Sequence, residues 1–517
     1  MDRVRQKIGV QKRGGVIGRL IFKLVVVVFA LPALAEPMVL TSDGLVEGSY
    51  QDQVAVFRGV PYAEPPIGEL RWRPPQPVLP RTHRLLAKQF GPRCMQRLPQ
   101  ENPPEVSEDC LTLNVWSPSL KKSNQPVMVW IHGGGFRAGS GDIPGHVMAK
   151  HGVVLVSINY RLGPLGFFAH PALQSETASF GVLDMIAALQ WVNENIARFG
   201  GDKTNITVFG VSAGAMAVNL LMTNPRAEGL FHKAIAQSGY GTWALPRTKA
   251  APEPARLAMD LKKPDSAEAW SARVIGEEDA SAISKPELLG LDGSALMYGL
   301  EGFQLPFVDG TAIVEEPGVL ARQCLQHDLP LIMGAASFEG SVQPASGITL
   351  DAFAQYHRDQ LDAARALYAS EFAQSETFGL KKMFGENRYL LAARTLGRAM
   401  ECKDQAAYLY YMNFIPERFA SEWVGTVHGA DGYFLWTGES TVDPKLVALS
   451  RRIQAYWVNF ARSGNPNGGA LASWPQFSET EPSWLMFADA DSVVRSLLRE
   501  RLDFLEEHYL RRIGENP

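Results

Sequence analysis

Short apolar runs alternate with longer amphipathic stretches over most of the chain. The runs are rich in β-branched and aromatic residues and lie at 126–133, 153–160, 205–210, 233–239, 329–334 and 408–414. Two longer stretches, 180–200 and 446–464, repeat apolar residues at helical spacing. Continuous apolar strands that alternate with helices are typical of a parallel sheet covered on both faces. We therefore predict an α/β fold with a large, mostly parallel central sheet flanked by helices.

Other segments add detail to this outline. Alternating apolar residues separated by turn residues at 39–66 predict antiparallel hairpins at the edge of the sheet. In the stretch 446–464 we expect Ile453, Tyr456, Trp457 and Phe460 to face the core and Gly464 to end the helix.

No repeat or low-complexity linker interrupts the chain, so we expect residues 36–517 to form a single domain. The stretch from about 241 to 305 is charged and weakly periodic. We expect this stretch, together with 345–400, to contribute helices of a cap over the site.

The N-terminus departs from the average composition. Residues 1–23 are strongly basic, and an apolar block ending in "PALAE" follows them. This pattern is typical of a secretory signal peptide, residues 1–35, cut after Ala35. The alternative is an uncleaved anchor, although the apolar run falls short of the ~20 residues that span a bilayer. We expect a secreted or periplasmic protein with no stable membrane insertion after signal cleavage.

Composition narrows the class of partner. Of the 517 residues, 46% are hydrophobic and 20% charged, which is typical of a globular protein. The formal net charge is −4. A slightly acidic net charge does not indicate the basic surface that binds nucleic acid, so we expect no nucleic-acid partner.

The chain has four cysteines, and an even number in an exported protein favours disulfides. Three pairings are possible. We favour Cys94 with Cys110, because the polar, proline-rich segment between them would form a compact loop whose closure is worth about 3 kcal/mol. Cys324 and Cys402 each precede a strand-like run, so neighbouring parallel strands could bring them together.

The sequence "NITVFGVSAGA", residues 205–215, places a serine between two glycines where an apolar strand turns into a helix. A strand, the pattern G-x-S-x-G and a helix together form the nucleophile elbow of α/β hydrolases. Gly210 and Gly214 would permit the strained turn that exposes the Ser212 hydroxyl. The alternative is a structural turn with no chemistry.

A second motif stands upstream. In "VMVWIHGGGF", residues 127–136, an apolar strand runs into three consecutive glycines. Without side chains, backbone N–H groups can approach a ligand closely, as an oxyanion hole requires. A flexible turn is the alternative, but the order of the two motifs favours a hydrolase.

With these motifs the chain resembles the type B carboxylesterase family, which includes cholinesterases and bile-salt-activated lipases. Its markers include "FRGVPYAEPPIGELRWRPPQP", "SEDCLTLNVW", "INYRLGPLGFF", "FHKAIAQSG", "GAASFEG", "VHGADGYFLW" and "YWVNFARSGNPN", in order over roughly residues 40 to 480. The resemblance implies the α/β-hydrolase fold and a catalytic triad of Ser212, Glu339 and His428. It further implies oxyanion donors at Gly134, Gly135 and Ala213 and a serine that supports the triad, Ser238. Next to the expected cap, we expect acyl-pocket residues near Gly239, Tyr240 and Trp243.

Chain order agrees with these implied roles. Glu339 and His428 each follow a strand-like run, and active sites of open sheets form at the carboxyl ends of strands. Asp309 is the competing acid, but it precedes its neighbouring strand. His357 and His508 lie in polar helical surroundings, where we expect them to be solvated. No cofactor or metal is implied, and no His/Cys/Asp cluster has zinc-like spacing.

The resulting hypothesis is an exported serine carboxylesterase acting on a small-molecule ester. One alternative is specialisation for a complex ester, such as a fumonisin-type mycotoxin side-chain ester or a lipid ester. A serine peptidase would share the triad, and a non-catalytic binding protein would share only the scaffold.

Two departures from the family predict poor hydrolysis of choline esters. Val211 replaces the glutamate that most members carry before the nucleophile, and no tryptophan lies between Cys94 and Cys110. A cation would therefore lack an attraction of about 0.5 to 2 kcal/mol to an aromatic face and would lose its hydration. We expect a lower kcat/KM for butyrylcholine than for its uncharged 3,3-dimethylbutyl analogue in direct competition at low ionic strength. A tenfold preference for the cationic ester would contradict this prediction.

Overall fold

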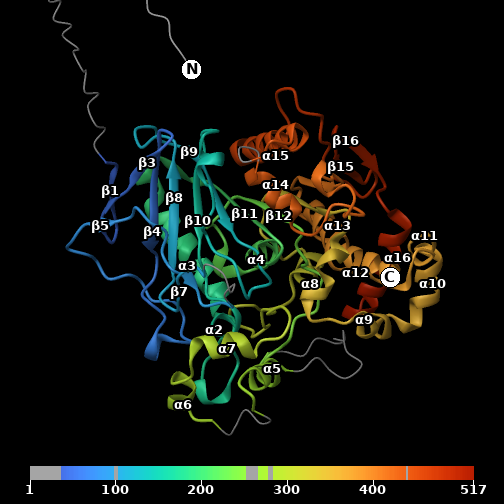
Figure 1. The fold of residues 1–517 in the computed structure, drawn as a ribbon, viewed down its shortest axis with the longest axis horizontal. Coiled ribbons are helices and arrows are strands. Elements are labelled where there is room, and N and C mark those ends of the chain that lie inside the picture. Colours follow the sequence, from blue (N-terminus) through green and yellow to red (C-terminus); the bar gives the residue numbers. More distant parts are fainter. Residues whose placement is uncertain (1–35, 98–102, 252–265, 278–282, 438–440, 517) are drawn as a thin grey trace, which may run out of the picture. The chain divides into compact units, whose positions relative to one another are not determined.

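A mixed sheet runs through the residues that the computed structural model describes, which are 36–97, 103–251, 266–277, 283–437 and 441–516. Its eleven strands have the order β16-β15-β14-β13-β12-β11-β9-β10-β8-β4-β3 (Figure 1). Their bounds are β3 (Ser49–Gln51), β4 (Val54–Pro61), β8 (Thr112–Ser117), β9 (Gln125–Ile131), β10 (Val154–Ile158), β11 (Gly201–Val211), β12 (Lys233–Gln237), β13 (Leu331–Ala336), β14 (Ala407–Met412), β15 (Ser483–Phe487) and β16 (Ser492–Arg495).

The centre of this sheet is parallel and its two edges are antiparallel. Every pairing from β10 through β9, β11, β12, β13 and β14 to β15 is parallel. The pairings β10–β8, β8–β4 and β4–β3 at one edge and β15–β16 at the other are antiparallel. The carboxyl ends of the parallel strands therefore meet along one rim of the sheet.

The predicted edge hairpins form, with one difference. β3 pairs with β4 at the edge of the large sheet, whereas β1 (Met38–Thr41) and β2 (Gly44–Glu47) build a separate small sheet with β5 (Leu85–Leu86). The short strands β6 (Arg93–Cys94) and β7 (Val106–Ser107) pair with each other.

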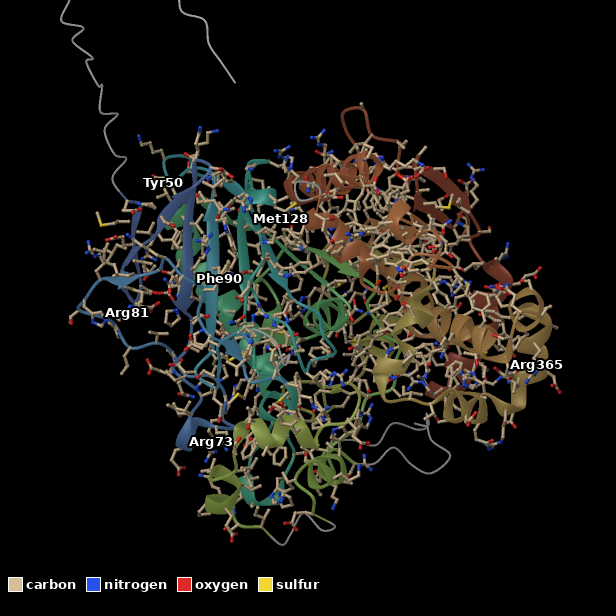
Figure 2. The ribbon with its side chains drawn as sticks, in the orientation of Figure 1. Tyr50, Arg73, Arg81, Phe90, Met128 and Arg365 are labelled. Carbon is tan, nitrogen blue, oxygen red and sulfur yellow. A yellow bond between two sulfur atoms is a disulfide. The ribbon has the colours of Figure 1, made fainter. Side chains whose placement is uncertain are left out.

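Both faces of the sheet are buried because successive side chains point to opposite sides. Along β9, Val127 and Val129 belong to one apolar cluster, and Met128 and Trp130 belong to the other. Met128, labelled in Figure 2, is fully buried, while Tyr50 at the sheet's edge is exposed. The continuous apolar runs of the sequence follow from this two-sided burial.

Helices cover each face. α3 (Phe180–Asn195), α4 (Ala213–Met222) and α13 (Leu391–Ala399) contribute to one cluster, and α14 (Ala430–Thr437) and α15 (Pro444–Ser463) to the other. The remaining α-helices are α1 (His146–Ala149), α2 (Gly163–Gly166), α5 (Ala267–Val274), α6 (Lys285–Leu289), α7 (Gly293–Gly299), α8 (Pro317–Arg322), α9 (Leu350–Tyr356), α10 (Leu361–Leu367), α11 (Ala369–Phe372), α12 (Glu376–Gly385) and α16 (Arg499–Ile513).

Helix α15 shows how local sequence fixes an element. The Asp443 side chain accepts hydrogen bonds from the N–H groups of Lys445 and Leu446 at the helix start. Gly464 ends the helix with φ 77°. The four residues predicted to face the core, Ile453, Tyr456, Trp457 and Phe460, are all fully buried.

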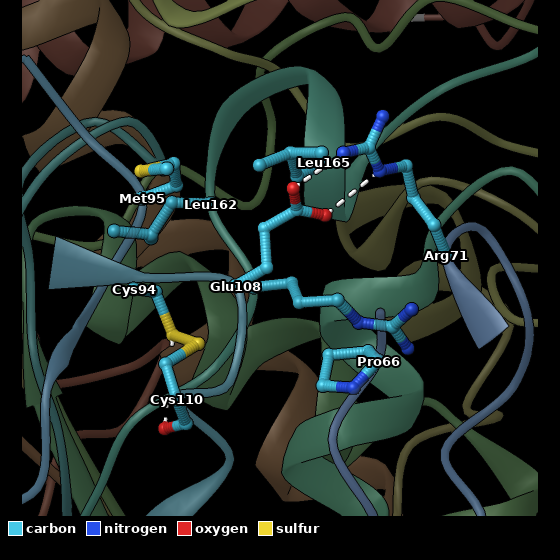
Figure 3. Close-up of a pocket in the computed structure, with 9 residues that line it drawn as sticks. Pro66, Arg71, Cys94, Met95, Glu108, Cys110, Leu162 and Leu165 are labelled. Carbon is cyan, nitrogen blue, oxygen red and sulfur yellow. Dashed lines mark hydrogen bonds and ion pairs between the residues drawn. A yellow bond between two sulfur atoms is a disulfide. The ribbon is translucent and has the colours of Figure 1, made fainter. Parts of the chain in front are cut away.

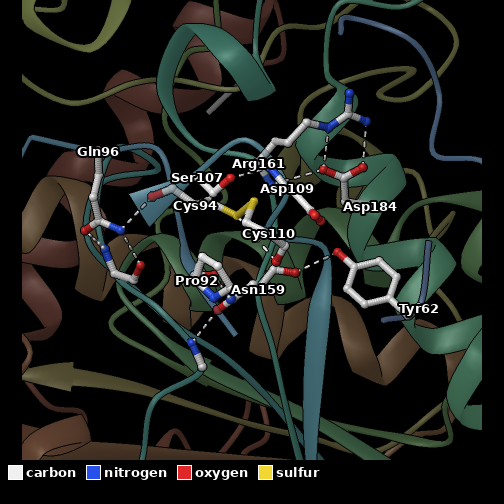
Figure 4. Close-up of a disulfide and its surroundings, with 12 residues drawn as sticks. Tyr62, Pro92, Cys94, Gln96, Ser107, Asp109, Cys110, Asn159, Arg161 and Asp184 are labelled. Atoms are coloured by element: carbon white, nitrogen blue, oxygen red, sulfur yellow. Dashed lines mark hydrogen bonds and ion pairs between the residues drawn. A yellow bond between two sulfur atoms is a disulfide. The ribbon is translucent and has the colours of Figure 1, made fainter. Parts of the chain in front are cut away.

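Both pairs of cysteines are joined as disulfides, Cys94 with Cys110 and Cys324 with Cys402. These are the pairings that the sequence favours. The second joins the segments that precede β13 and β14, which are adjacent parallel strands. Near the first disulfide, Arg161 forms a buried bidentate ion pair with Asp184 (Figure 4).

The predicted signal peptide, residues 1–35, lies outside the described residues. Within the described part of the chain, no helix is both long and apolar enough to cross a membrane. The two stretches expected to supply cap helices contain α5, α6 and α7 and then α9 to α13.

Candidate active site

Ser212 occupies a strained turn between β11 and α4. Its backbone has φ 57° and ψ −119°, a conformation that L-residues adopt only under constraint. The Ser212 N–H donates to the Gln237 carbonyl oxygen on β12 at 2.8 Å. A Cβ at Gly214 would lie 2.1 Å from the Ile131 carbonyl oxygen, so only glycine lets α4 approach β9 this closely.

His428 lies between Ser212 and Glu339. Its Nε2 is 2.7 Å from the Ser212 Oγ, and its Nδ1 contacts a Glu339 carboxylate oxygen. Because a carboxylate accepts hydrogen bonds, the Nδ1 carries the proton that it donates to Glu339. The Nε2 is then the acceptor for the Ser212 hydroxyl.

The segment that carries His428 is attached to the residues that follow β13. Phe338 and Val427 form an isolated parallel bridge. The His428 N–H donates to the Ser341 Oγ at 2.9 Å, and the Thr426 N–H donates to the Ser337 Oγ at 2.8 Å. The imidazole is therefore positioned by backbone contacts as well as by its carboxylate partner.

Glu339 is 2% exposed and fully hydrogen-bonded on the side away from His428. Its Oε1 accepts from the Ser238 hydroxyl and from the Ala336 N–H, each at 2.6 Å. Ser238 thus lies where the resemblance implied a supporting serine.

The glycine loop after β9 packs against the serine turn. Gly134 and Gly135 have φ of 110° and 63°, and a Cβ at Gly133 would lie 3.2 Å from the Ser212 Cβ. Among the described residues, the N–H groups of Gly134, Gly135 and Ala213 have no backbone acceptor. Ala213 is the first residue of α4, where N–H groups are free and favour negative charge.

His132 fixes the start of this loop without carrying charge. Burial lowers its pKa to about 4, so the ring is neutral at pH 7. The Nδ1 hydrogen-bonds to the Gly133 carbonyl oxygen at 2.8 Å, and the ring stacks on Tyr160.

Asp431 is a site residue that the sequence reasoning missed. It is fully buried, its Oδ2 lies 3.3 Å from the Ser238 Oγ, and that same oxygen accepts the Tyr410 hydroxyl. Burial, together with the nearby Glu339, raises its pKa to about 6. No local feature of the sequence signals this environment, because the groups that meet Asp431, Ser238 and the Tyr410 hydroxyl, come from other segments of the chain.

Aromatic rings lie behind the histidine. Tyr389 is centred 4.6 Å from the His428 ring and 5.8 Å from Tyr240. Gly239, Tyr240 and Trp243, the residues expected near an acyl pocket, are all buried.

The competing candidates lie elsewhere. Asp309 accepts from the backbone N–H groups of Ala178 and Ile313, so it anchors loops. The prediction that His357 and His508 are solvated is wrong. His357 is 1% exposed, its ring lies 4.4 Å from that of His508, and burial lowers the pKa of both, because α16 packs against α9 at this point.

A pocket borders the loop closed by Cys94 and Cys110 (Figure 3). Met95, Leu162 and Leu165 supply its apolar wall, and Glu108 is paired with Arg71. No tryptophan lines it, in keeping with the sequence of the loop.

No group of three or more His, Cys, Asp or Glu side chains among the described residues is arranged to hold a metal ion. The carboxylates of the site, Glu339 and Asp431, are held by hydrogen bonds from neighbouring residues.

Known proteins resemble this chain over most of its length. A model of the carboxylesterase family matches residues 35–505. The fumonisin B1 esterase of Sphingopyxis macrogoltabida is 32% identical and covers 84% of each chain. The liver carboxylesterase of Sus scrofa is 32% identical over 93% of this chain and 94% of its own, and the cholinesterase of Mus musculus is 31% identical over 86% and 81%.

Solved esterase structures share the fold. A carboxylesterase of Geobacillus stearothermophilus superposes with a TM-score of 0.77 at 28% identity, covering 90% of this chain and 99% of its own. A structure titled PNB esterase gives a TM-score of 0.75 at 28% identity, with 91% and 100% covered. The predicted α/β-hydrolase fold is confirmed.

The environment of Asp431 predicts a pH-dependent stability. A carboxyl whose pKa rises from 3.8 to about 6 on folding destabilises the fold as it ionises, by roughly 3 kcal/mol once the pH exceeds both values. Asp431→Asn removes that charge. Relative to wild type, the variant should therefore gain about 1.5 kcal/mol of unfolding free energy between pH 5 and pH 8.

Denaturant unfolding at the two pH values measures this gain. Asp489→Asn is the matched control, because Asp489 is exposed and paired with Lys445. An equal response of both variants to pH would contradict the prediction.

Proposed function

Because this chain belongs to the carboxylesterase family and is a carboxylic ester hydrolase, we propose that it acts through an acyl-enzyme formed on Ser212. His428 is the general base and acid, and Glu339 orients it. The single observation that carries this proposal is the placement of the His428 imidazole in contact with both the Ser212 hydroxyl and the Glu339 carboxylate.

Acylation begins with proton transfer. A serine hydroxyl is a weak nucleophile until a positioned base removes its proton. The His428 Nε2 accepts that proton as the Ser212 Oγ attacks the ester carbonyl carbon. Glu339 holds the imidazole in the tautomer whose Nε2 is free and stabilises the imidazolium that forms.

Attack places a negative charge on the former carbonyl oxygen. The N–H groups of Gly134, Gly135 and Ala213, which have no backbone acceptor among the described residues, are the proposed donors to this oxyanion. The N-terminus of α4 adds a favourable dipole. His428 then returns its proton to the leaving alcohol as the C–O bond breaks.

Deacylation repeats these roles with water. His428 takes a proton from water, the resulting hydroxide attacks the acyl carbon, and the Ser212 Oγ leaves with the proton from His428. The acid product departs and the enzyme is regenerated, without any cofactor or metal in these steps.

Ser238 and Asp431 support the triad in this proposal. The Ser238 hydroxyl holds the Glu339 oxygen that does not face His428. The Asp431 Oδ2 lies 3.3 Å from the Ser238 Oγ and accepts the Tyr410 hydroxyl, so these two residues pack behind Ser238.

We also propose that the protein is exported, with residues 1–35 as a cleaved signal peptide and 36–517 as the catalytic domain. The basic and apolar pattern of the N-terminus supports this proposal, as do the two disulfides, because disulfides persist in oxidising compartments. The helices of 241–305 and 345–400 are the proposed cap.

The similarity to the fumonisin B1 esterase favours one narrower candidate, a complex ester of the kind that the relative's name describes. This candidate uses the same triad, so it changes the substrate and not the chemistry. A serine peptidase is disfavoured, because the matched relatives and structures are esterases.

Ser212→Ala tests the nucleophile. Losing a triad serine lowers turnover by about a millionfold, while the buried scaffold keeps its contacts. We expect hydrolysis of 4-nitrophenyl butyrate to fall to the background rate and the melting temperature to change little. Retention of more than a few per cent of wild-type activity in a contaminant-free preparation would refute the assignment of Ser212 as the nucleophile, whereas a wild type that hydrolyses no ester would favour the non-catalytic alternative.

Glu339→Gln tests the orienting acid against its competitor. A glutamine can still fill the space but cannot stabilise the imidazolium, so kcat should fall by about 10³- to 10⁴-fold. Asp309→Asn is the comparison. It should lower the melting temperature, since Asp309 anchors loops, yet keep activity per folded molecule. The reverse result for the two variants would make Asp309 the acid.

A further inference from the structure

Arg388 is a buried cation close to the proposed catalytic centre. It lies in a π-helical segment, Glu386–Leu390, between α12 and α13 (Figure 1), and is 1% exposed. Single π-helical turns within longer helices occur frequently at functional sites. The next residue, Tyr389, packs on the His428 ring.

Arg388 differs from the other buried arginines of the described chain. Each of those pairs with a carboxylate, and the pairs are Arg161 with Asp184, Arg247 with Glu315, Arg394 with Glu506 and Arg512 with Glu316. No described carboxylate lies within ion-pair distance of Arg388, and its Nε and Nη2 have no hydrogen-bond partner among the described residues. A guanidinium stays charged in a protein, so such burial is costly without compensation.

Aromatic rings supply part of that compensation. The guanidinium carbon lies 4.2 Å from the Trp243 ring centre and 4.4 Å from that of Tyr240. These contacts stabilise the cation through its flat faces. The Tyr240 and Tyr389 hydroxyls also interact with the guanidinium, but its Nε and Nη2 donors point in the plane of the group and remain without a partner among the described residues.

The unsatisfied edge is the one that binds carboxylates elsewhere in this protein. Arg161 donates from its Nε and Nη2 to the two oxygens of Asp184 (Figure 4), and Arg71 does the same to Glu108 (Figure 3). The two free donors of Arg388 therefore match a carboxylate that arrives from outside the chain.

Carboxylates of the chain near Arg388 are already engaged. Glu386, in the same π-helical segment, pairs with Lys382 and Arg501 and accepts the Tyr368 hydroxyl. Glu339 contacts His428 and Ser238.

We propose that Arg388 binds a second carboxylate in the acyl group of the substrate, so that the preferred esters are half-esters of dicarboxylic or polycarboxylic acids. This inference rests on the proposed function. The acyl side is favoured because Tyr240 and Trp243, whose rings hold the guanidinium, follow Ser238 and are the expected acyl-pocket residues. Water is added across the acyl C–O bond, which releases the alcohol and a free dicarboxylate.

The test compares charged with uncharged acyl groups. The substrates are mono-4-nitrophenyl esters of straight-chain dicarboxylic acids of four to seven carbons, each matched with the same ester whose free carboxyl is methylated. Wild type should prefer the anionic member at one chain length by at least tenfold in kcat/KM, as a charge-assisted hydrogen bond supplies. Arg388→Gln should lose this preference but still hydrolyse the methylated ester, and Arg388→Lys should keep part of it.

Arg398→Gln is the matched control. Arg398 lies on the following helix and pairs with Glu479 and Glu506, so its loss removes one positive charge without touching the site. It should leave the charge preference unchanged. In the acetate ester of 4-hydroxybenzoate the carboxylate is on the alcohol. The kcat/KM for this ester should be the same for wild type and Arg388→Gln.

The outcomes separate the two hypotheses. If wild type hydrolyses the methylated esters but prefers no anionic partner, or prefers only the ester with its carboxylate on the alcohol, the Arg388 inference is overturned and the proposed function stands. If neither kind of ester is hydrolysed, the proposed function fails.

A second measurement uses wild type alone and tests the inference even if Arg388→Gln does not fold. The free dicarboxylate of the preferred length should inhibit wild-type hydrolysis of 4-nitrophenyl butyrate competitively and more strongly than the monocarboxylate of equal length. Equal inhibition by the two acids would overturn the inference.

Discussion

The close approach of α4 to β9 is the constraint on which the site depends. A side chain at Gly214 would collide with the Ile131 carbonyl, and a side chain at Gly133 would press on Ser212. With both positions reduced to glycine, the glycine loop and the serine turn lie against each other. The positive φ of Ser212 is then enforced by its surroundings, and the hydroxyl is presented at the rim where the parallel strands end.

Several charged groups are buried around this turn, and the partners that surround them differ. Glu339 receives hydrogen bonds from Ser238 and Ala336 and contacts His428. Asp431 has hydrogen-bond donors but no cation, and its pKa rises to about 6. Arg388 has aromatic rings but no carboxylate. Pre-arranged groups of this kind cost folding free energy and are typical of sites built for a ligand or a reaction.

The similarity to esterases of different substrates fits this picture. The relatives and solved structures that share the scaffold are all esterases by name. In the proposed function, the serine, histidine and glutamate act on the ester bond itself. Substrate choice depends on what surrounds the reacting atoms. In this chain Val211 packs against Gly432, and Arg388 lies beside Tyr389. The proposed preference for an anionic over a cationic ester depends on these groups.

The sequence by itself determined the fold class, the core of α15, the elbow and the order of its partners. These features are encoded locally, by strand and helix periodicity, by glycines where φ must be positive and by motifs of fixed spacing. Tertiary structure alone decided which buried groups find partners. His357 and His508 read as solvated because their neighbours in sequence are polar, yet the packing of α16 against the end of α9 buries His357 and brings the two rings together. Asp431 and Arg388 carry no local sign of their environment, since their burial and their partners come from segments far away in the chain. The burial of a side chain and the partners it meets depend on segments that are far apart in the chain, so no single stretch of sequence reveals them.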